Sequence, residues 1–347
     1  MLRTTLLHVL GFGLCGTAIG CGSDLDLPEY PLDGINVYVG FDEPICGGTF
    51  DWIEERLRWL EVETGLPASA APISFYWLRE DVFDHCPSGA CTRGDAFYTP
   101  LEVFSHELVH GHLAQLGRPL PWLTEGMAQM LEDSQWDVFS PMTPSIMLEA
   151  TDSLDIDYTA AASFVQYLRD RFGMAAVIEL YAALDRVDAQ ATPEVFLAVM
   201  GESWGAVEDD FLDTNDWSPV GSINCDFPEL APDDSGTWTL PVAPMCEDAA
   251  TVGPFLGWDD ADSPHTKRHV ILEIPEAGMY SFTMTSSAKV SIEILACDEP
   301  TRLYSRFGTH LAEEIEMVPG RKRLVLASNI ADRAVGEVVI RGPLPAP

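Results

Sequence analysis

Two histidines and a glutamate occur at a spacing that suits metal chemistry. Residues 106–110 read His-Glu-Leu-Val-His. Side chains at positions i and i+4 of a helix lie on one face, so His106 and His110 can reach a single ion. Glu107 lies about 100° around the same helix and can act as a general base on a water at that ion. The pattern predicts a zinc site, with a buried structural histidine pair as the alternative.

A second helix supplies a third ligand. Residues 119–131 begin with a proline-bounded turn, and Glu125 is the polar exception on the apolar face that follows. An isolated buried carboxylate is disfavoured, whereas zinc compensates its charge. An ordinary exposed glutamate is the alternative interpretation. The apolar members of that face are Trp122, Leu123, Met127 and Leu131.

The two motifs together resemble a known clan. His-Glu-x-x-His at 106–110 and Trp-Leu-Thr-Glu-Gly-Met-Ala at 122–128 are similar to the gluzincins, the thermolysin-like zinc peptidases, in particular their exported bacterial families. The resemblance spans roughly residues 35–215 and includes 158–173, which is similar to the helix that follows the glutamate helix. It implies that His106, His110 and Glu125 bind zinc, that Glu107 is the base, and that the substrate is a peptide or protein.

One position departs from the clan's pattern. Four residues after the ligand glutamate, where thermolysin-like enzymes have an acid that orients a histidine, this chain has Gln129. Its amide carbonyl can still accept the imidazole N–H, but it raises ligand basicity less than a carboxylate does. The competing metzincin pattern fails, because Leu113 and Leu116 stand where it requires Gly and His.

The chemistry expected at such a site is hydrolysis of a peptide bond. Zinc lowers the pKa of a bound water toward about 7 and polarises the substrate carbonyl, while Glu107 moves the proton. Tyr158, at the start of the next helix, is the candidate oxyanion donor, with simple packing of its ring as the alternative. His112 projects about 160° away from His110 and is expected at the surface or in a capping role.

The N-terminus predicts export. Residues 1–21 have an early Arg, a short apolar stretch and small residues before Cys21, which is typical of a signal peptide and too short for a comfortable membrane span. Ala18-Ile-Gly-Cys21 resembles a bacterial lipobox, so a lipid on Cys21 would anchor the chain to the membrane or cell surface, with plain secretion as the alternative. Residues 22–34 are expected to form a tether.

Cysteine usage agrees with export. Beyond Cys21 the chain contains Cys46, Cys86, Cys91, Cys225, Cys246 and Cys297. An even set in an exported chain predicts disulfide bonds, and the turn sequence from Cys86 to Cys91 allows those two to pair. The other pairings stay open. A cysteine-based zinc site is the rival interpretation, but the spacings lack the paired pattern of such sites.

The charge excludes some partners. The formal net charge is −36, from 55 acidic and 19 basic residues, which disfavours nucleic acid. Asp259, Asp260 and Asp262 could hold calcium, although such a loop is more often only solvated.

Two domains are expected. Residues 35–215 form an α+β zincin-like catalytic domain, with strands at 35–39, 73–78 and 95–99, helices at 50–65 and 101–116, and the substrate cleft between its mixed and helical parts. The strand at 95–99 is expected at the sheet edge, where it aligns an extended substrate. Further helices are expected at 158–172, 174–184, 192–200 and 204–212.

The second domain follows a linker. Residues 216–235 are rich in proline, glycine and aspartate, and residues 236–347 form a β-sandwich of short strands. The strands are expected at 236–242, 269–274, 278–285, 289–295, 313–318, 321–327 and 336–341.

Two hypotheses of function remain. The first is an exported zinc-dependent peptidase, which an intact Glu107 favours. The second is a catalytically inactive, surface-anchored binding or structural protein on a zincin scaffold.

Overall fold

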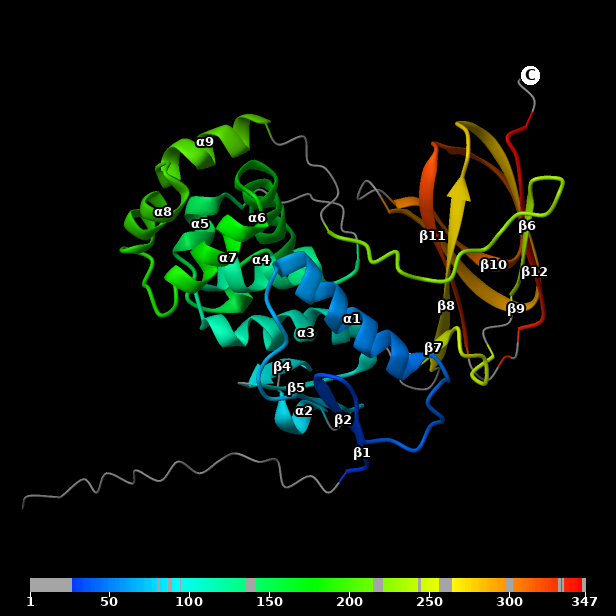
Figure 1. Cartoon of the computed structure of the whole chain (residues 1–347), viewed down its shortest axis with the longest axis horizontal. Helices are drawn as coiled ribbons and strands as arrows, with labels where there is room; N and C mark the ends of the chain where they lie inside the picture. Colours follow the sequence, from blue (N-terminus) through cyan, green and yellow to red (C-terminus); the bar gives the residue numbers. More distant parts are fainter. Residues whose placement is uncertain are drawn as a thin grey trace, which may run out of the picture.

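The computed structural model contains a mixed helix and sheet region followed by an antiparallel sheet region (Figure 1). It describes residues 27–79, 82–86, 89–93, 95–134, 142–214, 221–242, 245–255, 264–297, 302–329, 332 and 334–344. The expected signal peptide with Cys21, the first part of the tether and the candidate calcium ligands Asp259, Asp260 and Asp262 lie outside the described residues.

The N-terminal region is built on a sheet with the order β1-β2-β3-β5-β4. The central strands β2, β3 and β5 are parallel, and the flanking strands β1 and β4 run antiparallel to their neighbours. In β2 and β3, buried and half-buried residues alternate, as expected of a sheet with one face against a core. The strands are β1 (Glu29–Pro31), β2 (Ile35–Val39), β3 (Ile73–Trp77), β4 (Cys91–Arg93) and β5 (Ala96–Thr99).

Two expectations about this sheet are wrong. The strand at 96–99 is not at the edge, because β4 pairs with its outer side and takes that position. The range expected to be a tether contains β1, which pairs with β2. Both missed strands have three residues, too few for an alternating pattern to be recognised in the sequence.

Helices connect the strands and cover the sheet. Helix α1 (Thr49–Thr64) packs Ile53, Leu57 and Leu60 into the core that the sheet shares. The helix expected at 101–116 is shorter than predicted. Helix α3 (Phe104–Leu113) lies between the 3-10 turns η1 (Leu101–Val103) and η2 (Ala114–Leu116). A short helix, α2 (Val82–His85), precedes β4. In Figure 1, α3 lies between the sheet and the remaining helices.

The remaining helices form the second part of the N-terminal region. Helix α4 (Pro121–Leu131) lies against α6 so closely that a Cβ on Gly126 would come within 2.8 Å of the Ala161 carbonyl oxygen, so glycine is required there. The others are α5 (Pro144–Leu148), η3 (Ser153–Asp155), α6 (Tyr158–Phe172), α7 (Met174–Ala183), α8 (Thr192–Met200) and α9 (Trp204–Thr214). Within the described residues, no helix has both the length and the apolar character needed to cross a bilayer.

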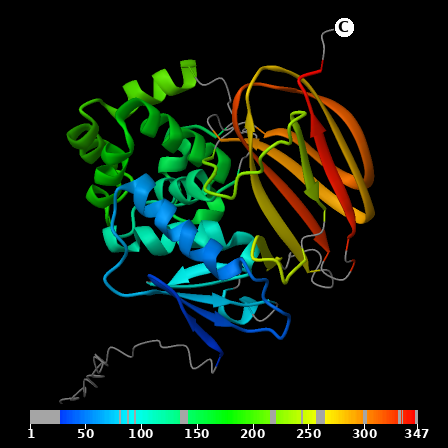
Figure 2. The same cartoon turned by 45° about the vertical axis from the view of Figure 1, so that its right-hand side comes forward.

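The C-terminal region is a seven-stranded antiparallel sheet that curls around its own core (Figure 2). The order is β6-β12-β9-β11-β8-β7, with β10 on the other side of β9. The strands are β6 (Thr237–Pro241), β7 (Thr251–Phe255), β8 (His265–Ile274), β9 (Gly278–Ala296), β10 (Arg302–Met317), β11 (Gly320–Asn329) and β12 (Gly336–Arg341).

One long strand replaces two expected ones. The sequence indicates separate strands at 278–285 and 289–295, but β9 is continuous over both. Its first half pairs with β12 up to Ser286, and its second half pairs with β11 from Val290 onward. The strand therefore passes between two parts of one curled sheet, where the sequence predicted two separate sheets of a sandwich.

The two regions are joined by more than the chain between them. Cys46 is disulfide-bonded to Cys246, and Thr49 exchanges hydrogen bonds with the backbone of Gly253 at 2.8 and 3.0 Å. Val252 and Phe255 of β7 belong to the core of the N-terminal region. The described part of the range expected to be a linker, residues 221–235, also contacts the sheet, where the backbone N–H of Leu230 donates to the Ile271 carbonyl.

The cysteines form three disulfide bonds, which agrees with an exported protein. The predicted pair Cys86–Cys91 is confirmed. The others are Cys46–Cys246 and Cys225–Cys297. Because all six cysteines are paired with one another, the rival cysteine-based zinc site is excluded.

Three histidines have pKa values lowered by burial. His269 on β8 stacks on Phe227 and is 7% exposed, with no hydrogen-bond partner on either ring nitrogen. Burial, and then the nearby charges of Arg323 and Lys267, hold its pKa well below the ordinary value of 6.5. Burial also lowers the pKa of His112 and that of His265 to about 4.

We expect the free energy of unfolding to fall as the pH drops below about 6.5, because the unfolded chain then binds protons that the folded histidines reject. Above that pH both states are neutral and the stability is complete. His269→Phe keeps the stack on Phe227 and should weaken this dependence by up to about 1.4 kcal/mol per pH unit. Urea unfolding at about pH 7 and about pH 5 measures it. The exposed His310→Phe is the control, and an unchanged slope in His269→Phe would contradict the assignment.

Candidate metal centre

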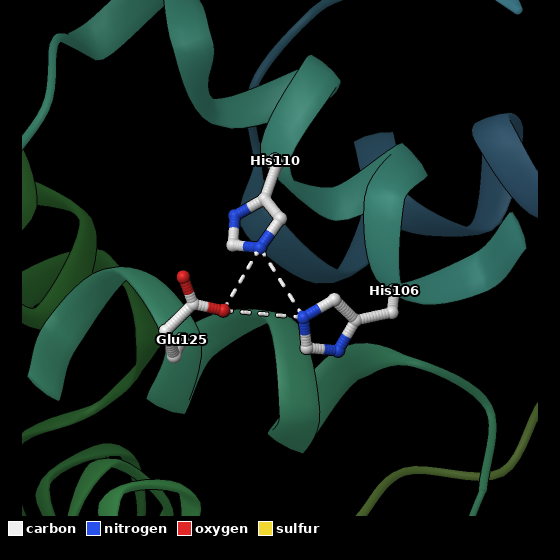
Figure 3. A group of neighbouring side chains, drawn as sticks. All are labelled: His106, His110 and Glu125. Atoms are coloured by element: carbon white, nitrogen blue, oxygen red, sulfur yellow. Dashed lines mark hydrogen bonds and ion pairs between the residues drawn. The ribbon is translucent and has the colours of Figure 1, made fainter. Parts of the chain in front are cut away.

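Three side chains from two consecutive helices converge on one point. His106 and His110 extend from α3, and Glu125 extends from α4 to meet them (Figure 3). The Nε2 atoms of the two histidines are 3.2 Å apart, and Oε2 of Glu125 is 3.2 Å from the first and 3.1 Å from the second. Among the described residues, these three form the only group of His, Cys, Asp or Glu side chains with metal-ligand spacing.

The geometry and chemistry of this group fit zinc. Ligand atoms about 2.0–2.1 Å from one tetrahedral ion lie about 3.3 Å from one another, close to the three separations observed. Two imidazole nitrogens and one carboxylate oxygen are a ligand set typical of catalytic zinc, which leaves a fourth position open. The three side chains are 12% to 14% exposed, so solvent can reach the point on which they converge.

The electrostatics of the group favour a cation. Burial lowers the pKa of His106, but hydrogen bonds to Glu125 and Glu132 outweigh it and raise that pKa to about 10. Burial raises the pKa of Glu125, and its hydrogen bonds to both histidines reverse this and hold the pKa well below its usual range. The carboxylates therefore stabilise positive charge between the two imidazoles, as a site for a divalent ion requires.

Glu107, the expected base, lies beside this group and is not one of its three members. Its side chain is 6% exposed, and its Oε2 accepts a hydrogen bond of 2.6 Å from the hydroxyl of Thr92 on the edge strand β4. The charge of Glu107 acts on both His106 and Tyr158. Arg118 donates to the backbone carbonyl of Thr92 at 3.0 Å. Sequence reasoning missed Thr92, because a three-residue strand gives no recognisable pattern.

A different residue from the expected one orients His106. Nδ1 of His106 is 2.9 Å from Oε2 of Glu132, immediately after the last residue of α4. Gln129, expected to accept the imidazole N–H, instead donates from Nε2 to Oε1 of Glu132 at 3.0 Å, and the Ser134 hydroxyl donates to the same oxygen. A carboxylate therefore takes the orienting role after all. The sequence contained the signal, because positions i and i+7 of a helix share a face and Glu132 follows Glu125 at that spacing.

The two remaining candidates lie in different places. Tyr158, the first residue of α6, has its ring parallel to that of His106 at a centroid distance of 5.9 Å, next to the site. Burial and then the charge of Glu125 raise the pKa of Tyr158, so its hydroxyl keeps its proton at neutral pH. His112 was expected at the surface but is fully buried, with Nε2 2.9 Å from the Thr64 hydroxyl of α1. It lies on the α1 side of α3, away from the three convergent side chains.

Comparisons with known proteins found no matching protein family and no similar curated protein. Three solved structures share a remote likeness with about a third of the chain. The pre-peptidase C-terminal domain of a Bacillus anthracis collagenase is 7% identical and has a TM-score of 0.21, over 33% of this chain and 91% of that one. The GH26-CBM35 β-(1,4)-mannanase of Podospora anserina is 9% identical with a TM-score of 0.22, over 33% of this chain and 29% of the mannanase.

A third likeness is to a family 29 carbohydrate-binding module, with 12% identity and a TM-score of 0.16, over 33% of this chain and 84% of that one. All three TM-scores are too low to support an argument about fold or function.

Proposed function

We propose that this protein is an exported, zinc-dependent peptidase of the gluzincin type, with a zincin-like catalytic domain and the curled C-terminal antiparallel sheet as accessory domain. The observation that carries the proposal is the convergence of His106, His110 and Glu125 within 3.2 Å of one another. Glu107 follows the first histidine directly, and its carboxylate is held in place by Thr92.

Each side chain has a definite task in this proposal. His106, His110 and Glu125 hold the ion, which when bound supplies Lewis acidity toward a carbonyl oxygen and acidifies a water. Glu107 takes a proton at its carboxylate and returns it to the leaving amine. The hydrogen bond from Thr92 occupies Oε2 of Glu107 and so fixes which way the carboxylate faces. Glu132 holds the ring of His106 through Nδ1, leaving Nε2 free to bind the ion.

The position of the edge strand supports a peptide substrate. β4 forms one of the two edges of its sheet, and its residue Thr92 is in direct contact with Glu107. An extended peptide can add to such an edge through backbone hydrogen bonds, and specificity then comes from the pockets for its side chains. A peptide bound along β4 would pass beside the proposed base.

Tyr158 is the proposed oxyanion donor. Tyr158→Phe should lower kcat for peptide hydrolysis by about 10²-fold while KM and zinc content change little, because the hydroxyl is needed mainly in the transition state. Steady-state kinetics together with metal analysis measure this effect. Tyr30→Phe is the control, because Tyr30 is an exposed tyrosine on β1 whose ring stacks on Phe50 and the change keeps that stack. A kcat close to that of the wild type would assign Tyr158 to packing alone.

A cleavage profile tests the proposed function. The purified chain is incubated with a degenerate peptide library, with and without a zinc chelator, and new N-termini are identified by mass spectrometry. We expect cleavage that the chelator abolishes and added zinc restores. A chain that binds zinc but cleaves no peptide would favour the alternative, an inactive binding protein on the same scaffold.

A further inference from the structure

We propose that the C-terminal sheet positions the metal ligand His106 through Arg323, Asp133 and Glu132, and is thus part of the metal centre and not an independent module. The inference rests on the proposed function, because it assigns a role to residues that act on the same ion.

The contact nearest to the metal site in this series is the one between Glu132 and His106. Oε2 of Glu132 is 2.9 Å from Nδ1 of His106, and the side chain of Glu132 is 10% exposed. Its other oxygen accepts hydrogen bonds from Gln129 and Ser134, so the carboxylate has a fixed orientation. The direction of the His106 ring therefore depends on where the backbone places residue 132.

The next residue fixes that backbone position. Asp133 has a φ of 63°, in the left-handed region that non-glycine residues rarely adopt. Aspartate tolerates this conformation better than most residues, but it still requires support from its surroundings. The support comes from a buried ion pair, because Nη1 of Arg323 is 2.6 Å from Oδ1 of Asp133, with the two side chains 4% and 5% exposed. The backbone N–H of Asn224 donates to the same oxygen at 2.7 Å.

Arg323 is itself rigidly held in the C-terminal sheet. It lies on β11, which is hydrogen-bonded on both sides, with Ile271 of β8 and Leu295 of β9 as its partners in register. Its guanidinium also donates to the Asn224 carbonyl at 2.9 Å and lies over the ring of Phe227. The sheet thus holds a buried charge at a fixed point directly beside the end of α4.

Neighbouring contacts hold the same turn. The Ser222 hydroxyl donates to the Met130 carbonyl at 3.0 Å, and the fully buried Arg56 of α1 donates to the Leu131 carbonyl. These carbonyls belong to the last turn of a helix, where no further backbone N–H is available to them. The end of α4 is therefore held from α1, from the segment before the sheet and from the sheet.

Removing Arg323 should weaken the binding of the metal. Without it, the Asp133 carboxylate is left buried with one backbone N–H, which is strongly unfavourable. The turn then relaxes and Glu132 no longer holds His106 in a single orientation. Loss of a residue that orients a ligand typically weakens metal binding by about 10-fold to 100-fold, and a more distant residue has a smaller effect.

The test measures zinc affinity in the full-length chain by competition with a coloured chelator. We expect Glu132→Gln to raise the Kd for zinc by at least about 10-fold and Arg323→Met to raise it by about fivefold. Arg321→Met is the matched control, because Arg321 lies on the same strand and donates to Cys225 without contacting residues 132–134. In the Glu132→Gln background, Arg323→Met should add less than about twofold, because both changes act through one carboxylate.

The outcomes are distinguishable. A wild-type chain that binds no zinc would overturn the metal site and this inference together. Wild-type affinity in Arg323→Met, or an undiminished effect in the Glu132→Gln background, would overturn the inference alone. If Arg323→Met does not fold, as judged by near-UV circular dichroism, Asp133→Asn replaces it. Asparagine tolerates the left-handed backbone and keeps an oxygen for Asn224, but it removes the charge that Arg323 needs. It should also weaken zinc binding by about fivefold, and an unchanged Kd would overturn the inference.

Discussion

Glu107→Gln is expected to lower kcat for peptide hydrolysis by at least about 10²-fold while zinc stays bound. The amide is nearly the same size as the carboxylate, and its carbonyl can still accept the hydrogen bond from Thr92. What it loses is the ability to take a proton, which is the role assigned to Glu107. Zinc remains because the three proposed ligands are unchanged.

The measurement combines steady-state kinetics on a peptide cleaved by the wild type with elemental analysis of the same sample. Glu102→Gln is the control, because Glu102 is an exposed glutamate just before α3. An unchanged rate in Glu107→Gln would remove Glu107 from the mechanism. Loss of zinc together with the rate would instead show that Glu107 supports the ion.

His110→Ala is expected to abolish zinc binding at micromolar metal and, with it, all peptide hydrolysis. The imidazole provides one of the three convergent atoms, and its Nε2 lies 3.1 Å from the carboxylate oxygen of Glu125. Two remaining protein ligands would hold zinc far more weakly than three. Because the side chain lies at the end of α3 and is partly exposed, the fold should survive the change.

Elemental analysis after dialysis against zinc and then buffer measures this effect, with His310→Ala as the control. His310 is an exposed histidine on β10, so its removal should leave about one zinc per chain. Full retention of zinc by His110→Ala would reject the ligand assignment.

The features that were predictable from the sequence are local. The two histidines of α3 share one helix face, so their spacing alone predicts that they meet. Glu125 was expected from its position among apolar residues, and the structure does place it 3.2 Å or less from both imidazoles. The disulfide between Cys86 and Cys91 was expected for the same reason, because a short turn connects its two cysteines.

What the sequence did not reveal depends on contacts between distant segments. The ion pair between Asp133 and Arg323 joins the turn after α4 to β11, and no local spacing relates these residues. The place of β4 at the sheet edge likewise depends on its pairing with β5 and not on a pattern within three residues. The continuity of β9 was missed because Ser286, Ser287 and Ala288 resemble a turn, whereas pairing with β12 up to Ser286 and with β11 from Val290 keeps the residues between them in one strand.

Glu132 shows how a pattern borrowed from other proteins can mislead. The expected orienting position was 129, and the glutamine there suggested a weakened site. The carboxylate is supplied from the end of the same helix, and Gln129 assists it through a hydrogen bond of 3.0 Å. A search for any acid on the face of Glu125 would have found Glu132, seven residues further along.

X-ray absorption spectroscopy at the zinc edge of the purified full-length chain tests the central claim most directly. The account predicts about one zinc per chain with nitrogen and oxygen ligands at about 2.0–2.1 Å, and with the outer-shell scattering of two imidazoles. A chain that retains no zinc after equilibration with the metal, or a spectrum with sulfur ligands at about 2.3 Å, would contradict it.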